Sequence, residues 1–326
     1  MRAIVLDAPG TVEAPGALVI RDVSTPVATA GEVLIRVKAF GLNRSELHTR
    51  MGLAVGVTFP RVPGIEATGI VESAPGGEFA VGQQVMTMMG GMGRQRDGGY
   101  AEYTLVAASQ VIPFSSTLPW STLGALPEML QTAYGSLTVG LDAQSGQSIL
   151  IRGGTSSIGM ITAVLAKLQG MTVLSTTRNP AKAAALSAIG VDHVIIDDGD
   201  VAAQVRAILP DGVDTALELV GANVLPDTLR AVRYHGVVCF TGMLSNTWTI
   251  PDFYPNDDLP RGVRLAGYHG DASDLPAEVL QSFLDAVAAG DAVVPIDSVY
   301  GFDDILAAHA VMEAGTGVGK LVVVVD

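Results

Sequence analysis

The chain has a single cysteine, Cys239, which excludes internal disulfides and any metal site built from several thiolates. Cys239 lies in the apolar run Gly236–Phe240, so we expect its side chain to be buried. Histidine is also scarce, and the residues show no ligand spacing: His48, His193, His235, His269 and His309. No metal site is therefore expected.

Charged residues make up only 16% of the chain, and they leave a formal net charge of -14 at pH 7. No basic run interrupts this negative charge, so neither nucleic acid nor an anionic lipid surface is an expected partner. No apolar run approaches the roughly 18 residues of a membrane span. The first run, Met1–Asp7, reads as a strand without a cleavable pattern, so we expect a cytoplasmic protein.

What the chain does contain is a glycine-rich turn between a predicted strand and a predicted helix. The turn reads Gly153-x-x-Ser156-x-x-Gly159, with Ser156 where the dinucleotide-binding fingerprint has its middle glycine. Free N–H groups at the helix start and the lack of side chains at Gly153, Gly154 and Gly159 favour a bound pyrophosphate at this turn. The alternative is that the glycines only close a corner between strand and helix.

A second strand, Met171–Thr177, follows this helix at the spacing of a βαβ unit. An NAD site carries Asp or Glu at the end of that strand, but no carboxylate occurs between the glycine turn and Asp192. The strand ends in Thr177 and Arg178, with Lys182 one helical turn further on. We therefore predict NADP(H), with these three residues at the 2′-phosphate. For the two cations, the alternative is a solvated helix start.

The order of the predicted elements indicates an α/β fold with two domains. Short strands punctuated by glycine and proline precede Leu118, and Glu32–Phe40 alternates most clearly between apolar and polar residues. From Leu118 to about Tyr268, apolar strands alternate with helices, which indicates a doubly wound parallel sheet. Two helices then lead to the apolar strand Gly319–Asp326, which needs a partner, most simply in the first domain.

Several segments together resemble the medium-chain dehydrogenase/reductase superfamily, specifically its zinc-free quinone oxidoreductase branch, which includes the zeta-crystallin-like enzymes. The segments follow the order and spacing of that family from end to end: Gly41–Glu46, Pro63–Gly69, Gly98–Tyr103, Leu126–Tyr134, Gly153–Gly159, Leu219–Gly221 and Gly319–Val322. The resemblance implies a GroES-like, β-rich catalytic domain of residues 1–118 and 265–326. It also implies a Rossmann domain of residues 119–264, and a homodimer paired through the strand around Val237–Phe240.

On the substrate side, the resemblance implies that Asn43 faces the nicotinamide and donates its amide to a substrate oxygen. Capping of a short helix, with Glu46 at its third position, is the alternative for Asn43. Gln131 and Thr132 match residues near the nicotinamide, or else pack between domains. Tyr100 belongs to a Gly-Gly-Tyr motif that can also be a turn with a packed aromatic residue.

On the cofactor side, the resemblance implies that Gly242, Met243 and Lys320 close around the dinucleotide. It also implies that the pyrophosphate is held by Gly153, Ser156, Ser157, Ile158 and Gly159. An exposed strand start is the alternative for Lys320. The family's zinc alcohol dehydrogenases carry a Cys ligand where this chain has Asn43, and a His-Glu pair where it has Ile65 and Glu66. Neither Asn nor Ile replaces such ligands, which agrees with the absence of a metal.

The function implied is an NADPH-dependent, zinc-independent transfer of hydride to a quinone or another activated conjugated carbonyl. Family members often carry a tyrosine shortly after the position of Gly52, whereas this chain continues Leu53–Gly56, which leaves the acceptor open. Two alternatives remain. One is an enoyl or alkenal reductase on the same scaffold, and the other is a non-catalytic NADPH-binding protein.

Overall fold

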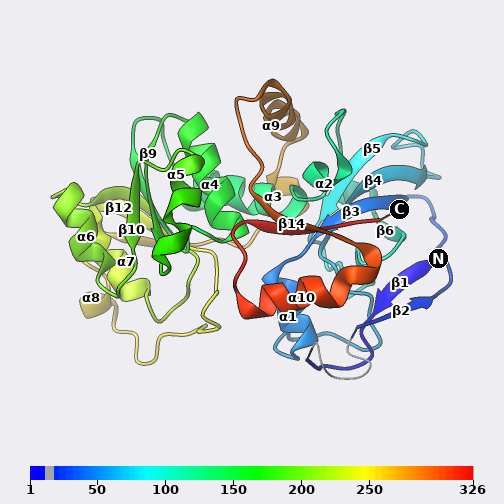
Figure 1. The fold of residues 1–326 in the computed structure, drawn as a ribbon, viewed down its shortest axis with the longest axis horizontal. Coiled ribbons are helices and arrows are strands. Elements are labelled where there is room, and N and C mark those ends of the chain that lie inside the picture. Colours follow the sequence, from blue (N-terminus) through cyan, green and yellow to red (C-terminus); the bar gives the residue numbers. More distant parts are fainter. Residues whose placement is uncertain (12–17, 326) are drawn as a thin grey trace. The chain divides into compact units, whose positions relative to one another are not determined.

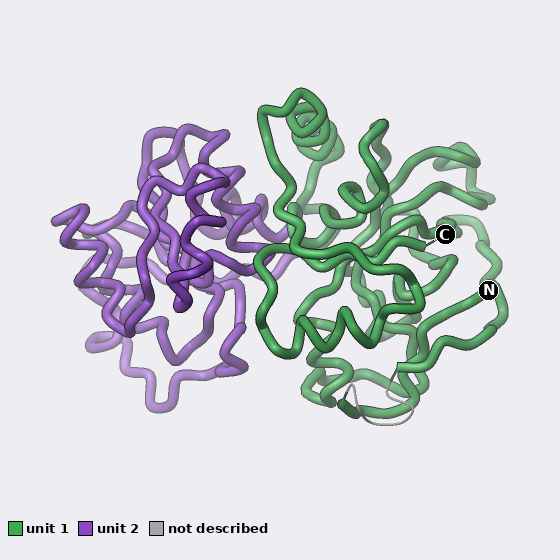
Figure 2. The backbone as a smooth tube through the Cα atoms, in the orientation of Figure 1, with its two compact units in different colours: residues 1–131, 271–326 green, residues 132–270 purple. Residues whose placement is uncertain are grey.

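A computed structural model of the chain describes residues 1–11 and 18–325. The chain divides into two compact units, one of residues 1–131 with 271–326 and one of residues 132–270 (Figure 2). Both ends of the chain therefore build one unit. The boundaries lie further along the chain than 118 and 264, because α2 (Trp120–Leu123) contacts strands of unit 1. In addition, residues 264–267 join the sheet of unit 2.

Unit 1 is built on a mixed sheet in the order β14-β15-β3-β4-β5-β7, with β6 also paired to β3 (Figure 1). Its strands are β3 (Glu32–Gly41), β4 (Glu66–Ser73), β5 (Gln84–Met88), β6 (Tyr103–Ala107), β7 (Val111–Pro113), β14 (Ile296–Gly301) and β15 (Lys320–Val324), and β1 (Arg2–Val5) and β2 (Val19–Asp22) form a separate pair. The alternation of β3 places Val33, Ile35 and Val37 in the core, as its sequence pattern predicts.

The helices of unit 1 connect or cover these strands. They are α1 (Arg44–Arg50), α2, α3 (Pro127–Gly135, which runs on into unit 2), α9 (Ala277–Ala289) and α10 (Ile305–Ala314). The last strand, β15, pairs antiparallel with β3, so that Val322 lies opposite Gly41. The prediction that the chain returns to its first domain is confirmed.

Unit 2 contains a six-stranded parallel sheet in the order β10-β9-β8-β11-β12-β13. The strands are β8 (Ser148–Arg152), β9 (Thr172–Thr177), β10 (His193–Ile196), β11 (Val213–Glu218), β12 (Val232–Phe240) and β13 (Arg264–Gly267), and the helices are α4 (Ser157–Leu168), α5 (Ala183–Ala188), α6 (Val201–Ile208), α7 (Leu225–Ala231) and α8 (Pro255–Asp258). Leu150 and Leu174 pack on one face with α6 and α7, and Ile149, Ile151 and Val173 are buried on the other. The doubly wound sheet is confirmed.

One expectation about this sheet is wrong. Residues 237–240 of β12 pair with β11 on one side and with β13 on the other, from Val237 opposite Arg264 to Phe240 opposite Gly267. Both edges of this strand are occupied, so it has no backbone groups left to pair with a second copy of the chain. The outer strand on this side of the sheet is β13.

Cys239 is fully buried, and burial raises the pKa of its thiol while Thr241 lowers it. Over residues 1–11 and 18–325, no helix is long and apolar enough to cross a membrane.

Candidate functional site

The glycine turn joins β8 to α4 in a conformation that depends on its glycines. Gly153 has a φ of 90°, which L side chains rarely adopt. A Cβ at Gly154 would collide with Ser175 Oγ, and a Cβ at Gly159 would lie 2.5 Å from the carbonyl oxygen of Gly153. The turn is therefore tight, because neighbouring atoms occupy the space that side chains at Gly154 and Gly159 would need.

Ser156 organises the start of α4. Its hydroxyl donates to the Gly153 carbonyl at 2.8 Å and accepts from the Gly159 N–H at 3.1 Å. The preceding N–H groups, those of Ser157 and Ile158, belong to the first helical turn, where no intrahelical acceptor exists. These N–H groups suit an anion, and the binding of a pyrophosphate at Gly153, Ser156, Ser157, Ile158 and Gly159 stays a prediction.

The proposed 2′-phosphate residues lie at the end of β9, the neighbour of β8. Thr177 is buried and its hydroxyl accepts from the Asn179 N–H at 3.2 Å. Arg178 follows the strand and is exposed, and Lys182 is half-buried in the single turn Pro180–Lys182 (η3). The glycine turn is linked to β9, because Thr176 Oγ1 accepts from the Gly153 N–H at 3.1 Å.

The loop after β12 contributes the next two predicted residues, Gly242 and Met243. The Gly242 N–H donates to the Glu218 carbonyl at 3.1 Å, and the Leu244 N–H donates to the Leu219 carbonyl at 3.1 Å. A Cβ on Gly153 would lie 3.1 Å from Leu244 Cδ1. The loop after β12 and the glycine turn therefore meet at the carboxyl ends of the strands, the edge where ligands bind in such sheets.

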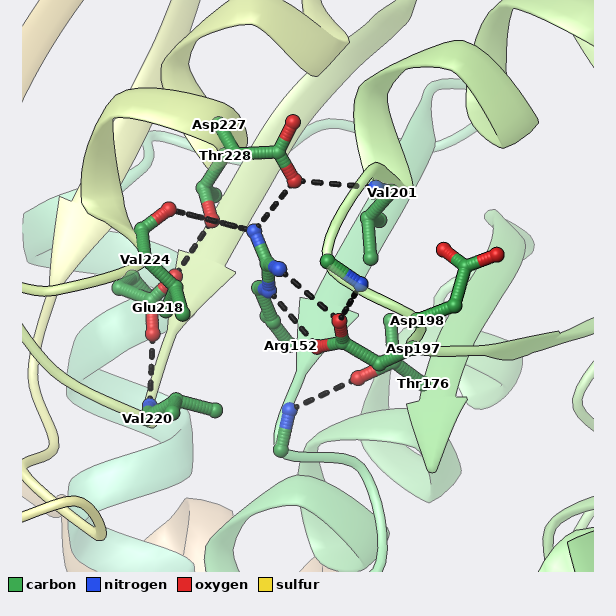
Figure 3. A network of polar contacts seen from close by, with 12 residues as sticks. Arg152, Thr176, Asp197, Asp198, Val201, Glu218, Val220, Val224, Asp227 and Thr228 are labelled. Carbon is green, nitrogen blue, oxygen red and sulfur yellow. Dashed lines mark hydrogen bonds and ion pairs between the residues drawn. The ribbon is translucent and has the colours of Figure 1, made fainter. Parts of the chain in front are cut away.

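A buried arginine that the sequence reasoning missed, Arg152, lies at the centre of this edge (Figure 3). It is the last residue of β8, directly before Gly153. Its guanidinium pairs with both carboxylate oxygens of Asp197, from Nε at 2.9 Å and from Nη2 at 3.0 Å. Its Nη1 donates to Asp227 Oδ2 at 2.7 Å and to Thr228 Oγ1 at 3.1 Å. The available signal was a charged residue ending an otherwise apolar strand.

Arg152 faces three carboxyl groups, those of Asp197, Glu218 and Asp227. Burial lowers the pKa of Arg152, but the hydrogen bond and charge of Asp197, with the charges of Glu218 and Asp227, raise it overall. Burial raises the pKa of Glu218 to about 7, although its carboxylate accepts from Thr228 and from the N–H groups of Gly221 and Val220. Thus Arg152 stays charged, and it supplies the positive charge that this buried edge requires.

In unit 1, a second polar cluster surrounds Lys320. This side chain is fully buried, so the predicted alternative of an exposed strand start is wrong. Its ammonium lies 2.7 Å from Glu66 Oε1 and 3.5 Å from Glu128 Oε2, and it donates to Asn43 Oδ1 at 2.5 Å. Carboxylates hold Lys320 in place, and its role toward a cofactor stays a prediction.

Asn43 is the N-cap residue of α1, but its side chain does not cap the helix. The Glu46 carboxylate accepts from the Asn43 backbone N–H at 2.9 Å, as in the predicted capping alternative. The Asn43 amide instead donates to Glu66 Oε1 at 2.8 Å. Both ends of the amide therefore have partners within unit 1, and donation to a substrate oxygen stays a prediction.

Glu46 also belongs to this cluster, and its residue is only 1% exposed. Burial raises the pKa of Glu46 to about 7, the Glu66 charge adds to the rise, and the Ile65 N–H and Lys320 oppose it. The Ile65 N–H donates to Glu46 Oε1 at 2.8 Å. The cluster thus holds a buried carboxyl group that titrates near neutral pH.

The remaining predicted side chains are enclosed. Tyr100 is fully buried, stacks on Phe40 at 4.5 Å between ring centroids and has its hydroxyl 3.2 Å from His309 Nε2, which is the packed-aromatic alternative. Burial and Arg50 lower the pKa of His309 to about 3. Gln131 and Thr132 follow one another in α3 and are both buried. Among the described residues, no group of His, Cys, Asp or Glu is arranged to hold a metal ion.

Two family models match the chain. The alcohol dehydrogenase GroES-like domain matches residues 29–116, and the zinc-binding dehydrogenase model matches residues 189–323. A GroES-like unit combined with a Rossmann unit and its glycine turn defines a nicotinamide-dependent oxidoreductase.

Individual relatives point the same way. Quinone oxidoreductase of Mus musculus is 26% identical over 313 residues, which cover 92% of this chain and 91% of that protein. The synaptic vesicle membrane protein VAT-1 homolog of Danio rerio is 25% identical over 92% of this chain, but the chain spans only 66% of that protein's length. A quinone oxidoreductase structure from Pseudomonas syringae shares the fold, with 22% identity, a TM-score of 0.87 and 99% of each chain covered. This chain belongs to the medium-chain dehydrogenase/reductase superfamily, in its quinone oxidoreductase branch.

Proposed function

We propose that the protein is an NADPH-dependent, zinc-independent reductase that transfers hydride to a quinone or another activated conjugated carbonyl. The observation that carries this proposal is the tight glycine turn between β8 and α4, where the N–H groups of Ser157 and Ile158 in the first turn of α4 have no intrahelical acceptor and can bind a pyrophosphate. The names of relatives, such as quinone oxidoreductase, support the acceptor class.

NADPH is the proposed cofactor because cations follow the strand that neighbours the turn. Arg178 is exposed directly after β9, and Lys182 lies in the following turn, Pro180–Lys182 (η3). A 2′-phosphate would meet the guanidinium of Arg178 and the ammonium of Lys182, whereas NADH offers only a hydroxyl there.

The Arg178→Ala, Lys182→Ala double variant should lose most of its preference for NADPH over NADH, as measured by cofactor fluorescence titration. Lys167→Ala, at the other end of α4, is the matched control. Equal affinity of the wild type for the two cofactors would contradict the proposal.

The chemistry proposed needs no Lewis acid. A bound NADPH supplies the hydride, and a conjugated acceptor delocalises the charge that the hydride brings. The residues that match zinc-ligand positions, Asn43 and Glu66, converge here on the Lys320 ammonium, which already neutralises Glu66. Asn43, Gln131 and Thr132 stay our candidates for the acceptor side, where they would orient the acceptor.

The direct test is a substrate screen. NADPH absorbance should fall in the presence of members of a panel of quinones and conjugated enones, and the rate should survive dialysis against a chelator. A preference for enones over all quinones would favour the enoyl reductase alternative. Tight NADPH binding with no turnover of any acceptor would support the non-catalytic alternative, and stoichiometric zinc by elemental analysis would overturn the zinc-independent mechanism.

We also propose a cytoplasmic homodimer. Among the described residues, β13 is the outermost strand beside β12, so Arg264–Gly267 offers the sheet edge at which a second copy could pair. Light scattering should give twice the mass of the chain, and a Pro at Leu265 should reduce it to that of one chain if the edge pairs.

A further inference from the structure

The sheet brings a carboxylate to the place where the sequence has none. Asp197 follows β10, and its N–H donates to the carbonyl of Thr177, the last residue of β9, at 2.9 Å. Its side chain is 11% exposed. A carboxylate at this position of the sheet edge is suited to accept the 2′-hydroxyl of NAD, and its charge would repel a 2′-phosphate.

Arg152 holds that carboxylate. Its guanidinium pairs with both oxygens of Asp197 in a fork, and Figure 3 shows the Asp197 carboxylate turned toward Arg152. The guanidinium itself is fully buried and is fixed on its other side by Asp227 and by the Val224 carbonyl at 3.2 Å. The next residue, Asp198, points away from Arg152 in Figure 3 and accepts from Gln204 at 2.8 Å.

We propose that Arg152 is a positioning residue that determines cofactor specificity: by pairing with both oxygens of Asp197, it keeps this carboxylate from recognising a 2′-hydroxyl or repelling a 2′-phosphate. The inference rests on the proposed function, since it explains how a site with an acidic neighbouring strand accepts NADPH. It adds a residue of the strand β8, remote in the sequence from Arg178 and Lys182, to the determinants of the cofactor.

Arg152 acts on Asp197 through its charge and its hydrogen bonds. A bidentate arginine donates to both oxygens of the carboxylate and offsets part of its charge at close range, even though Arg152 also pairs with Asp227. Without Arg152, the carboxylate would be uncompensated in a partly buried position, where charges interact more strongly than in water. It would then accept a hydrogen bond from the ribose of NADH, and it would disfavour the doubly charged 2′-phosphate.

The alternative is that Arg152 only ties the loops after β10 and before α7 to the sheet. Such a role predicts a general loss of stability and equal weakening of both cofactors. The ratio of the two dissociation constants therefore separates the alternatives, because a structural tie leaves that ratio unchanged.

The experiment compares the full-length wild type, Arg152→Met, Asp197→Asn and the double variant. Dissociation constants for NADPH and NADH are measured by cofactor fluorescence. Arg152→Met should lower the preference for NADPH by about tenfold or more. Asp197→Asn should keep the preference, and adding it to Arg152→Met should restore the preference, because no carboxylate remains to be held.

Controls keep the outcome interpretable. Arg233 pairs with Asp214 at 2.6 Å at the opposite end of the same sheet, in a more exposed position, so Arg233→Met breaks an arginine–carboxylate pair away from the glycine turn and should leave the ratio unchanged. If Arg152→Met does not fold, Arg152→Lys is used, since one ammonium cannot pair with both oxygens of Asp197 in a fork and should give a smaller shift in the same direction.

Failure of the inference differs from failure of the proposed function. If the wild type prefers NADPH and Arg152→Met or Arg152→Lys keeps that ratio, or if Asp197→Asn does not rescue it, the inference is overturned. If the wild type binds both cofactors equally, the proposed NADPH preference is wrong. The inference then still depends on whether the Arg152 variant moves toward NADH and the double variant moves back.

Discussion

The Lys320 ammonium and Glu66 Oε1 lie 2.7 Å apart, and neither side chain is exposed to solvent. Lys320 begins β15 and Glu66 begins β4, two strands that lie on either side of β3. The pair reaches across the end of β3 at Gly41, where a Cβ would lie 2.5 Å from Glu66 Oε1. Because Gly41 on the middle strand has no side chain, a buried ion pair can join the C-terminal strand β15 to β4.

Removing one partner of this pair should be costly. Lys320→Met leaves Glu66 buried without its counterion, so we expect a loss of about 3–5 kcal/mol in the free energy of unfolding, measured by urea denaturation. The double variant Lys320→Met with Glu66→Gln should recover a large part of this loss, because no uncompensated charge remains.

The exposed pair Lys167–Asp192 is the control for Lys320. Its rupture in Lys167→Met should cost less than about 1 kcal/mol. Similar losses for the two lysine variants would show that burial does not govern the Lys320 pair.

Gly41→Ala should also destabilise the protein. The added methyl group would collide with Lys320 Cε and with the Glu66 carboxylate, and such overpacking costs about 1–3 kcal/mol. Gly267 in β13 offers a comparison, since a Cβ there meets nothing within 4 Å. Thermal unfolding of the two alanine variants is the measurement, and an unchanged midpoint for Gly41→Ala would mean that the ion pair is not held across Gly41.

The pH dependence of stability should carry the signature of Glu46. Its pKa rises from 4.5 to about 7 on folding, so the native state binds this proton more tightly than the unfolded chain does. The stabilisation is complete below the lower value and is lost as the pH rises to the higher one. The Glu46→Gln variant should therefore show a smaller decline than the wild type, by at most a few kcal/mol, because the raised pKa of Glu218 maintains the rest, while Glu72→Gln on the surface should keep the whole decline. Parallel stability curves for wild type and Glu46→Gln, from urea unfolding across this range, would contradict the prediction.

The fold could be predicted from the sequence because its strongest signals are local. Apolar strands alternate with helices through unit 2, and the glycine turn marks where β8 becomes α4, so the parallel sheet followed from spacing alone. The return of the last strand to the first domain followed from its apolar run, which needed a partner, although its pairing with β3 did not. The end of the sheet could not be predicted, because β13 is a short strand with exposed residues and only its pairing with β12 defines it.

The candidate site was harder to predict from the sequence than the fold, because the pairing of strands decides which side chains come into contact. The end of β9 carries no carboxylate, whereas Asp197 reaches the same edge from β10 and is paired with Arg152 of β8. Asn43 was read correctly as the start of α1, but its amide is engaged by Glu66 and Lys320, which are remote in the sequence. Long-range partners of this kind leave no periodic pattern in the chain.

Ser156 provides a last test, since it replaces the middle glycine of the dinucleotide fingerprint. Its hydroxyl caps α4 by accepting from the Gly159 N–H, so Ser156→Ala should lower the free energy of unfolding by about 1 kcal/mol in urea denaturation. Ser156→Gly should lower the free energy of unfolding by only about a few tenths of a kcal/mol, because glycine leaves the N–H groups open to water. Both variants keep the backbone cradle, so NADPH affinity should change less than it does in the Arg178 and Lys182 double variant. If glycine proved as costly as alanine, the hydroxyl would matter through its bond to the Gly153 carbonyl, and the serine would serve the shape of the turn more than the helix.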